Sequence, residues 1–99
     1  MTYIIFEVKS ENVGKINSLA KDDLVSRQSI LTRDASALDM NGDVSYVKIE
    51  GSDKGLKRAK ELAKELKFKK LGEKKAKEVD EKIKEQEDSA ASGMGMIFD

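Results

Sequence analysis

The chain has 99 residues, and 38% of them are charged, with 19 basic and 19 acidic side chains that cancel at neutral pH. This length corresponds to one domain, and the balanced charge gives no overall attraction to nucleic acid or to a membrane surface. The chain has no Cys and no His, which excludes disulfides, thiolate metal sites and the usual general base and zinc ligand.

Signals for a membrane or for secretion are missing from the sequence. The longest apolar run is Ile4–Phe6, far shorter than a bilayer span. The N-terminus does not have the basic start and apolar stretch of a signal peptide. We therefore expect a cytoplasmic protein without a membrane partner. No nucleophile stands near a recognisable base, so we also expect no enzymatic activity.

The first third of the chain predicts a strand, a helix and a second strand. Tyr3–Val8 is rich in β-branched and aromatic residues and has apolar side chains on both faces, as a strand inside a sheet would. Ser10 is suited to cap a helix, which we expect to end near Lys21–Asp23. Leu24–Arg33 alternates loosely and predicts another strand.

The middle of the chain predicts a β-hairpin. Asn41-Gly42 is the strongest short-range signal for a type I′ turn, because both residues tolerate a positive φ. With that turn, Met40 faces Asp43, and Val44–Glu50 forms the second arm. Alternate residues would then share one apolar face of the hairpin. This interpretation explains the stretch without any functional site.

Two helices and a final strand are expected after the hairpin. Ser52 suits the cap of a helix with a clear apolar stripe, and we expect that helix to end at Gly72. Residues 73–88 predict a further helix, exposed and charged. Its narrow apolar seam suggests that it detaches in part or packs on a second subunit. A small-residue linker at 89–93 and a last strand at 94–98 complete the chain.

These elements predict an α+β fold, with residues 1–99 as a single domain. The antiparallel sheet would have about four strands, in the chain order β-α-β-β-α-(α)-β. Without the additional helix, this is the split βαβ order of ferredoxin-like folds. By analogy of fold with ACT-type regulatory domains, one interpretation is a ligand-sensing or protein-interaction domain that acts as a homodimer.

A second interpretation of the hairpin is a metal site. Counted from the first of them, side chains with oxygen atoms occupy positions one, three, five, seven and twelve: Asp39, Asn41, Asp43, Ser45 and Glu50. This spacing resembles the calcium loop of the EF-hand family. The resemblance implies that these five residues bind Ca²⁺ as a cofactor. The family has Gly at position six, where this chain has Val44, and no helix is under way after Glu50.

A lysine cluster offers a third interpretation. Six lysines lie between Lys67 and Lys77, opposed only by Glu73, and Phe68 lies among them. Such a cluster could bind phosphates while the aromatic ring stacks on a base. The alternative is a solvated helix end whose lysines favour the helix dipole, with Phe68 in the core. Nucleic-acid binding is the weaker of these two interpretations.

The chain as a whole resembles small α+β proteins of archaea, some of which are described as calcium-binding. The resemblance rests on the length, the absence of Cys and His, the acidic turn and the excess of Lys and Glu, which is also typical of thermophile proteins. The function predicted from the sequence is therefore a small calcium-binding module. A homodimeric ligand-sensing or protein-interaction domain and a nucleic-acid-binding domain are the alternatives.

Overall fold

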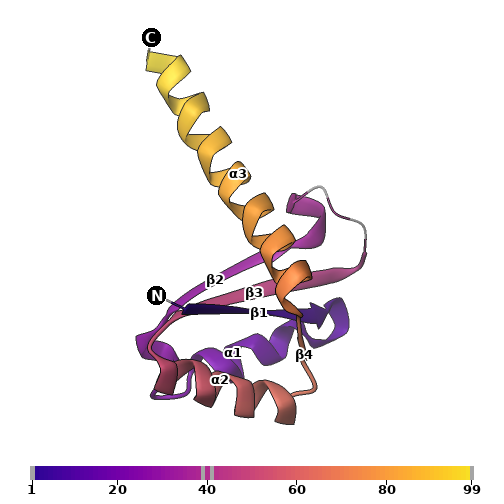
Figure 1. Cartoon of the computed structure of the whole chain (residues 1–99). Coiled ribbons are helices and arrows are strands. Elements are labelled where there is room, and N and C mark those ends of the chain that lie inside the picture. Colours follow the sequence, from indigo (N-terminus) through magenta and orange to yellow (C-terminus); the bar gives the residue numbers. More distant parts are fainter. Residues whose placement is uncertain (1, 39, 41, 99) are drawn as a thin grey trace.

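The computed structural model describes the backbone of residues 2–38, 40 and 42–98, and the side chains of residues 2–38, 40 and 42–86. Its elements in chain order are β1 (Thr2–Lys9), the 3-10 helix η1 (Ser10–Lys15), α1 (Ile16–Ala20), the 3-10 helix η2 (Val25–Arg27), β2 (Ser29–Asp34), the 3-10 helix η3 (Ala35–Leu38), β3 (Val44–Gly51), α2 (Asp53–Glu65), β4 (Lys69–Lys70) and α3 (Glu73–Phe98). The four strands form one antiparallel sheet in the order β2-β3-β1-β4 (Figure 1). The predicted α+β class is confirmed.

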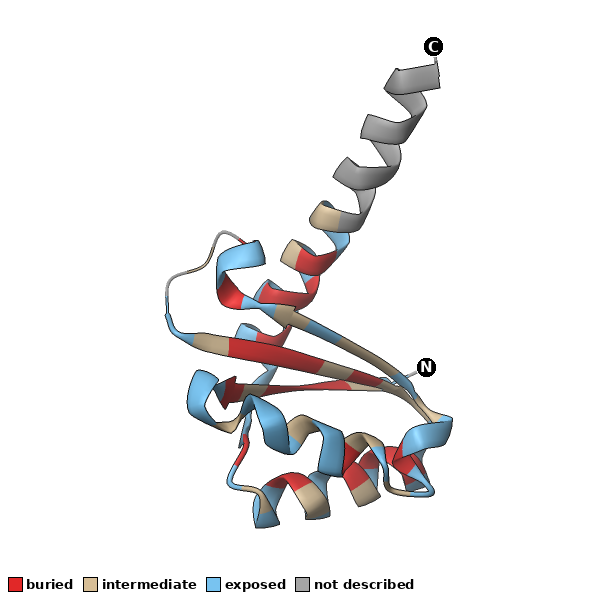
Figure 2. Cartoon of the chain, turned by 180° about the vertical axis from the view of Figure 1, so that it is seen from behind, coloured by how far each residue is buried: buried red, intermediate tan, exposed pale blue. Residues whose placement is uncertain are grey.

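Helices cover both faces of the sheet. Successive residues of a strand point to opposite faces, so β1 and β3, which are apolar on both faces, supply two cores. The core under α1 and α2 contains Ile4, Phe6, Val8, Leu19, Val25, Val47, Ile49, Leu56, Ala59, Ala63 and Phe68. The core under α3 contains Ile5, Ala35, Leu38, Tyr46, Leu71, Ala76, Val79 and Ile83. Figure 2 shows how the buried residues concentrate along the central strands and the inner sides of the helices.

Helix α2 begins where the sequence predicts and ends earlier. The Ser52 hydroxyl caps it by accepting a hydrogen bond from the Gly55 amide at 3.2 Å. The helix ends because Lys67 adopts a left-handed conformation, with φ of 63°. The Phe68 amide then donates to the Ala63 carbonyl at 2.8 Å, as in a Schellman motif. The prediction that α2 continues to Gly72 is wrong, because the chain turns to bury Phe68 and to pair β4 with β1.

The connection between β2 and β3 is longer than the predicted two-residue turn. The two strands pair from Asp34 and Ser45 onward, so the chain between them spans residues 35–43. This segment contains η3, whose residues Ala35 and Leu38 are buried against α3. The prediction that Met40 faces Asp43 across a tight hairpin is therefore wrong. Burial of two apolar side chains outweighs the local turn preference of Asn-Gly, and Asn41 itself lies outside the described residues.

Helix α3 lies against the sheet as far as its side chains are described. Ala76, Val79, Asp80 and Ile83 are buried on its inner side. Gln86 adds two hydrogen bonds, accepting from Arg33 Nε at 3.0 Å and donating to the Ala37 carbonyl at 2.7 Å. The helix predicted over 73–88 is formed in this part, with most of its charged residues exposed and its predicted seam buried. The seam does not detach here, because polar contacts on the inner side supplement it.

The last part of the chain is helical, where a linker and a strand were predicted. The backbone of α3 continues as one helix to Phe98, so the strand predicted at 94–98 is not formed. The position beside β1 in the sheet is taken by β4. Extension of α3 is also favourable, because each residue added to an existing helix gains a hydrogen bond without the cost of nucleating a new helix. Among the described residues, no helix combines the length and hydropathy that a bilayer crossing requires.

Candidate binding groove at the open edge of the sheet

The predicted calcium loop is only partly described by the structure. Asp39 and Asn41 lie outside the described residues. Asp43 directly precedes β3, and its Oδ1 accepts a hydrogen bond from the Ser10 hydroxyl at 2.5 Å. The Ser10 amide also donates to the Asp43 carbonyl oxygen at 3.1 Å. These two bonds tie the start of β3 to the start of η1.

Ser45 and Glu50 do not converge with Asp43 on a common point. Ser45 is 3% exposed, and its hydroxyl donates to Asp34 Oδ1 at 2.7 Å. Glu50 lies near the far end of the eight-residue strand β3, roughly 23 Å along the strand from Asp43. One calcium ion, with ligands about 2.3–2.6 Å away, cannot contact both. No group of three or more acidic side chains within the described residues is placed to hold a metal ion, so a site in the loop before β3 stays a prediction.

The lysines between Lys67 and Lys77 do not all lie on one face of the sheet. Lys69 and Lys70 are successive residues of β4, so their side chains point to opposite faces of the sheet. Phe68 is 7% exposed and belongs to the core beneath α2. Its ring is therefore not available to stack on a base, which removes the aromatic contact that single-stranded nucleic-acid sites use.

The structure also leaves part of the β1 edge of the sheet open, in addition to the outer edge of β2, which pairs with β3 alone among the described strands. The two residues of β4 pair only with Phe6 and Glu7 of β1, and one further bond joins the Leu71 amide to the Ile5 carbonyl oxygen at 3.0 Å. Toward the start of β1, no described strand lies beside this edge. Because alternate residues of a strand point their backbone groups to the same edge, the N–H and C=O of Tyr3 face this open position.

A cavity of about 680 Å³ lies along this open edge. Its floor is the segment Thr2–Ile5 of β1. One wall comes from Lys60 of α2 with Lys70 of β4. The other comes from the first three turns of α3, where Ala76 belongs to the core beneath the helix. We call this cavity the edge groove. Its shape follows from the three-layer fold, because helices on both faces rise on either side of an unpaired strand edge (Figure 1).

An ion pair fixes the α3 wall of the edge groove. Asp80 is 4% exposed, and its carboxylate contacts Lys48 Nζ at 2.5 Å and Lys84 Nζ at 3.2 Å. Burial raises the pKa of Asp80, but the hydrogen bonds from the two lysines outweigh it, so the pKa lies below its ordinary value. Lys48 Nζ also lies 5.0 Å from the centre of the Tyr3 ring. These contacts hold α3 and Tyr3 in place on one side of the groove.

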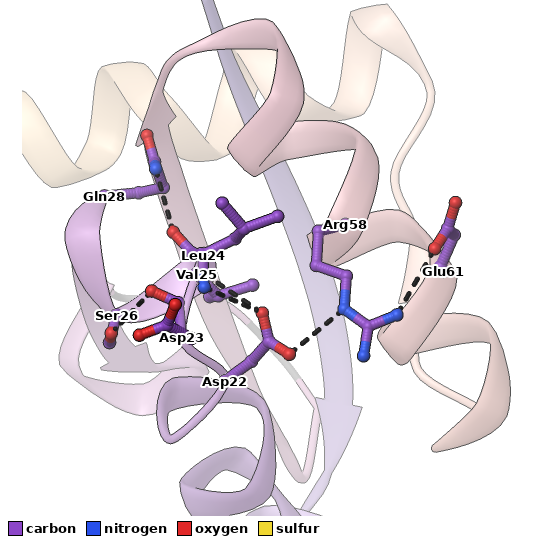
Figure 3. A network of polar contacts seen from close by, with 8 residues as sticks. All are labelled: Asp22, Asp23, Leu24, Val25, Ser26, Gln28, Arg58 and Glu61. Carbon is purple, nitrogen blue, oxygen red and sulfur yellow. Dashed lines mark hydrogen bonds and ion pairs between the residues drawn. The ribbon is translucent and has the colours of Figure 1, made fainter.

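A polar network fixes the α2 wall (Figure 3). Asp22 accepts hydrogen bonds from the amides of Leu24 and Val25 and from Arg58 Nε, the last at 3.0 Å. Burial raises the pKa of Asp22, but the hydrogen bonds from Arg58 and Val25 outweigh it, so the pKa is lowered. Arg58 lies half a turn before Lys60 on α2, so this network positions the part of the helix that reaches the groove.

Little in the sequence could have pointed to the edge groove. Its floor was predicted correctly as a strand, but its openness depends on the shortness of β4, and Lys69-Lys70 has no strand pattern. The groove offers apolar side chains, unpaired backbone groups and lysine ammonium groups. This combination suits the binding of a chain segment.

Comparisons with known proteins give no relative from which a function could be transferred. No protein-family model, curated protein or solved structure matches the chain. The resemblances to EF-hand loops and to archaeal calcium-binding proteins therefore stay predictions from the sequence. The function has to be inferred from the geometry of the edge groove.

Proposed function

We propose that this chain is a protein-interaction domain that binds an extended peptide segment as an additional strand on the open edge of β1. The observation that carries the proposal is the edge groove, which places the backbone groups of Tyr3 between walls from α2 and α3. Strand addition of this kind uses backbone hydrogen bonds for affinity and side-chain pockets for specificity. The bound segment would lie beside the start of β1, in the same position in the sheet as β4.

The size of the groove supports this proposal. A volume of about 680 Å³ falls within the range of roughly 300–1,000 Å³ that is usual for ligand sites. Four residues of floor correspond to about 13 Å of strand, enough for a short extended segment. A second cavity, which lies over Ser29–Leu31 of β2 and over Lys48 and Glu50 of β3, measures only about 210 Å³, so the edge groove is the larger of these two cavities.

The proposal includes a fold assignment. The chain order of β1, α1, β2, β3, α2 and β4, together with the strand order β2-β3-β1-β4, supports a ferredoxin-like architecture to which α3 is added. In this architecture the last strand is an edge strand beside β1. Reduction of that strand to Lys69–Lys70 is what exposes the rest of the β1 edge to a ligand.

Substitution of Tyr3 by proline tests the proposal. Proline removes the N–H that faces the groove but no bond to β3, and edge positions tolerate proline. Tyr3→Ala is the control, because both variants lose the ring. The probe is a blocked seven-residue peptide that alternates Val with Ser, Thr or Gln. We expect Tyr3→Pro to bind it about five- to tenfold more weakly than Tyr3→Ala, the effect of one net hydrogen bond of about 1–1.5 kcal/mol.

Amide NMR shows where the probe binds. We expect shifts on addition of the peptide at Thr2–Ile5 and Leu71, with Ser29–Asp34 of β2 unchanged. Equal binding by the two variants, shifts confined to β2, or no binding to the wild-type chain would each refute strand addition at this edge. Far-UV circular dichroism of each variant checks that the fold is retained.

A further inference from the structure

The two walls of the edge groove differ in charge. On the α2 side of the sheet, the groove is lined by Lys60 and Lys70, which are both exposed. Neither forms an ion pair with another residue in the described part of the chain. No acidic residue of α2 or β4 lines the groove. The charged side chains of this wall are therefore all basic, while Thr2 and Ile4 line its base.

The α3 wall is mixed in charge and has an apolar base. Lys77 and Lys84 alternate along it with Glu73, Asp80 and Glu81, and Asp80 already holds Lys84 in an ion pair. Near the sheet, this wall presents apolar atoms of Tyr3, Ile5, Leu71 and Ala76. Charges of both signs favour neither an acidic nor a basic ligand, so the apolar base decides what fits on this side.

Alternate residues of an added strand would face these two walls in turn. Resting on the strand-addition function proposed above, we infer that the natural partner is another protein that presents an extended segment in which acidic and apolar residues alternate. The acidic side chains lie beside Lys60 and Lys70. The apolar side chains lie against Tyr3, Ile5 and Ala76. A shift of one residue would place carboxylates on the mixed wall and apolar groups beside ammonium groups, so the charge also sets the register.

A second copy of this chain fits the groove poorly. Antiparallel pairing of two β1 edges in one continuous sheet keeps the same face of both copies on the same side. The α2 walls would then meet, with Lys60 and Lys70 of one copy near the same lysines of the other, and like charges repel. Single-stranded nucleic acid also fits less well. It would use the lysines but not the backbone groups of Tyr3, and Phe68 is buried.

Three blocked seven-residue probes test the inference, and they alternate Val with Glu, Gln or Lys. We expect the Glu probe to bind the wild-type chain about five- to tenfold more tightly than the Gln probe at low salt, and the Lys probe to bind most weakly. In the double variant Lys60→Glu/Lys70→Glu this order should reverse. The double variant Lys21→Glu/Lys54→Glu makes the same change in net charge away from the groove and should keep the wild-type order.

The outcomes separate the partner chemistry from the function. If the Gln probe binds and Tyr3→Pro weakens it, but the Glu probe gains nothing, the acidic partner is refuted and strand addition stands. If no probe binds, the proposed function fails. A dimer in analytical ultracentrifugation that Tyr3→Pro dissociates would replace the acidic partner by a second copy. If an oligothymidine binds more tightly than the Glu probe and Tyr3→Pro does not weaken its binding, the partner is nucleic acid and not an acidic protein segment.

Discussion

At the residue scale, Gln28 shows how one side chain restricts positions that are distant in the sequence. Its Nε2 donates to the Leu24 carbonyl oxygen, and its Oε1 accepts from the Ser52 amide, each at 2.9 Å. The side chain lies directly against Gly51 and Gly55, where an added Cβ would overlap it. The absence of a side chain at these two positions lets Gln28 link η2 to the capped end of α2, the helix that forms one wall of the edge groove.

This contact predicts that the effect of Gly55→Ala on the free energy of unfolding depends on the residue at position 28, and that it changes sign when Gln28 is removed. Alanine normally favours a helix by about 0.5–1 kcal/mol over glycine. In the wild-type chain, displacement of Gln28 loses two hydrogen bonds and should make Gly55→Ala destabilising by about 1 kcal/mol. In the Gln28→Ala background, Gly55→Ala should be stabilising by about 0.5 kcal/mol. Urea unfolding of the four chains measures this coupling, and additive effects would contradict it.

At the element scale, α3 shows why a docked helix was expected to be exposed. Its inner side repeats at helical spacing as Ala76, Val79, Asp80 and Ile83, and the acidic residue interrupts the apolar stripe that sequence analysis relies on. The partner that makes Asp80 acceptable is Lys48, a residue of β3. A pairing between elements this far apart in the chain has no local signal, whereas the Ser52 cap and the strand β3 were predictable because their determinants are local.

The ion pair of Asp80 predicts a loss of stability in acid. The pKa of Asp80 is lowered in the folded chain, so the unfolded chain, with a value of about 3.9, binds more protons between the two values. The contribution of Asp80 is therefore complete above about pH 4 and is lost as the pH falls through the folded pKa. Asp80→Asn should cost roughly 1.5–3 kcal/mol at pH 7, and this difference from wild type should shrink toward pH 2.5.

Urea unfolding of wild type and Asp80→Asn between pH 7 and 2.5 measures that difference. Asp23→Asn is the control, because the Asp23 side chain is 88% exposed, and its difference from wild type should stay small throughout. A penalty for Asp80→Asn that remains constant or grows in acid would show that Asp80 does not act through its charge.

At the scale of the whole molecule, the candidate site is a product of how the layers are arranged. The sequence predicts β1 as an interior strand with both faces apolar. The structure confirms the two apolar faces, but β1 lies between two paired strands only at Phe6 and Glu7. The open edge arises because, of the residues that connect α2 to α3, only the two of β4 pair with β1 as a strand. The groove needs Lys60, Lys70 and the start of β1 to meet in space, and these come from three elements. A motif within one segment cannot predict that three separate elements come together. The sequence therefore predicted a site only in the loop before β3, where the candidate ligands are close in sequence.

The length of β3 also predicts how tightly the loop before this strand would bind calcium. A calcium site formed by Asp39, Asn41 and Asp43 without Glu50 has lost the bidentate ligand that closes the EF-hand loop, so its affinity should be weak, about 10⁻⁴–10⁻³ M. We expect Ca²⁺, but not Mg²⁺, to cause saturable amide NMR shifts near Asp43 and Ser10. Asp43→Asn should abolish them, whereas Glu50→Gln should leave them unchanged, because the strand holds Glu50 roughly 23 Å away. Loss of binding in Glu50→Gln would mean that β3 does not persist in the bound state, and an absence of saturable shifts would leave the loop as a connection alone.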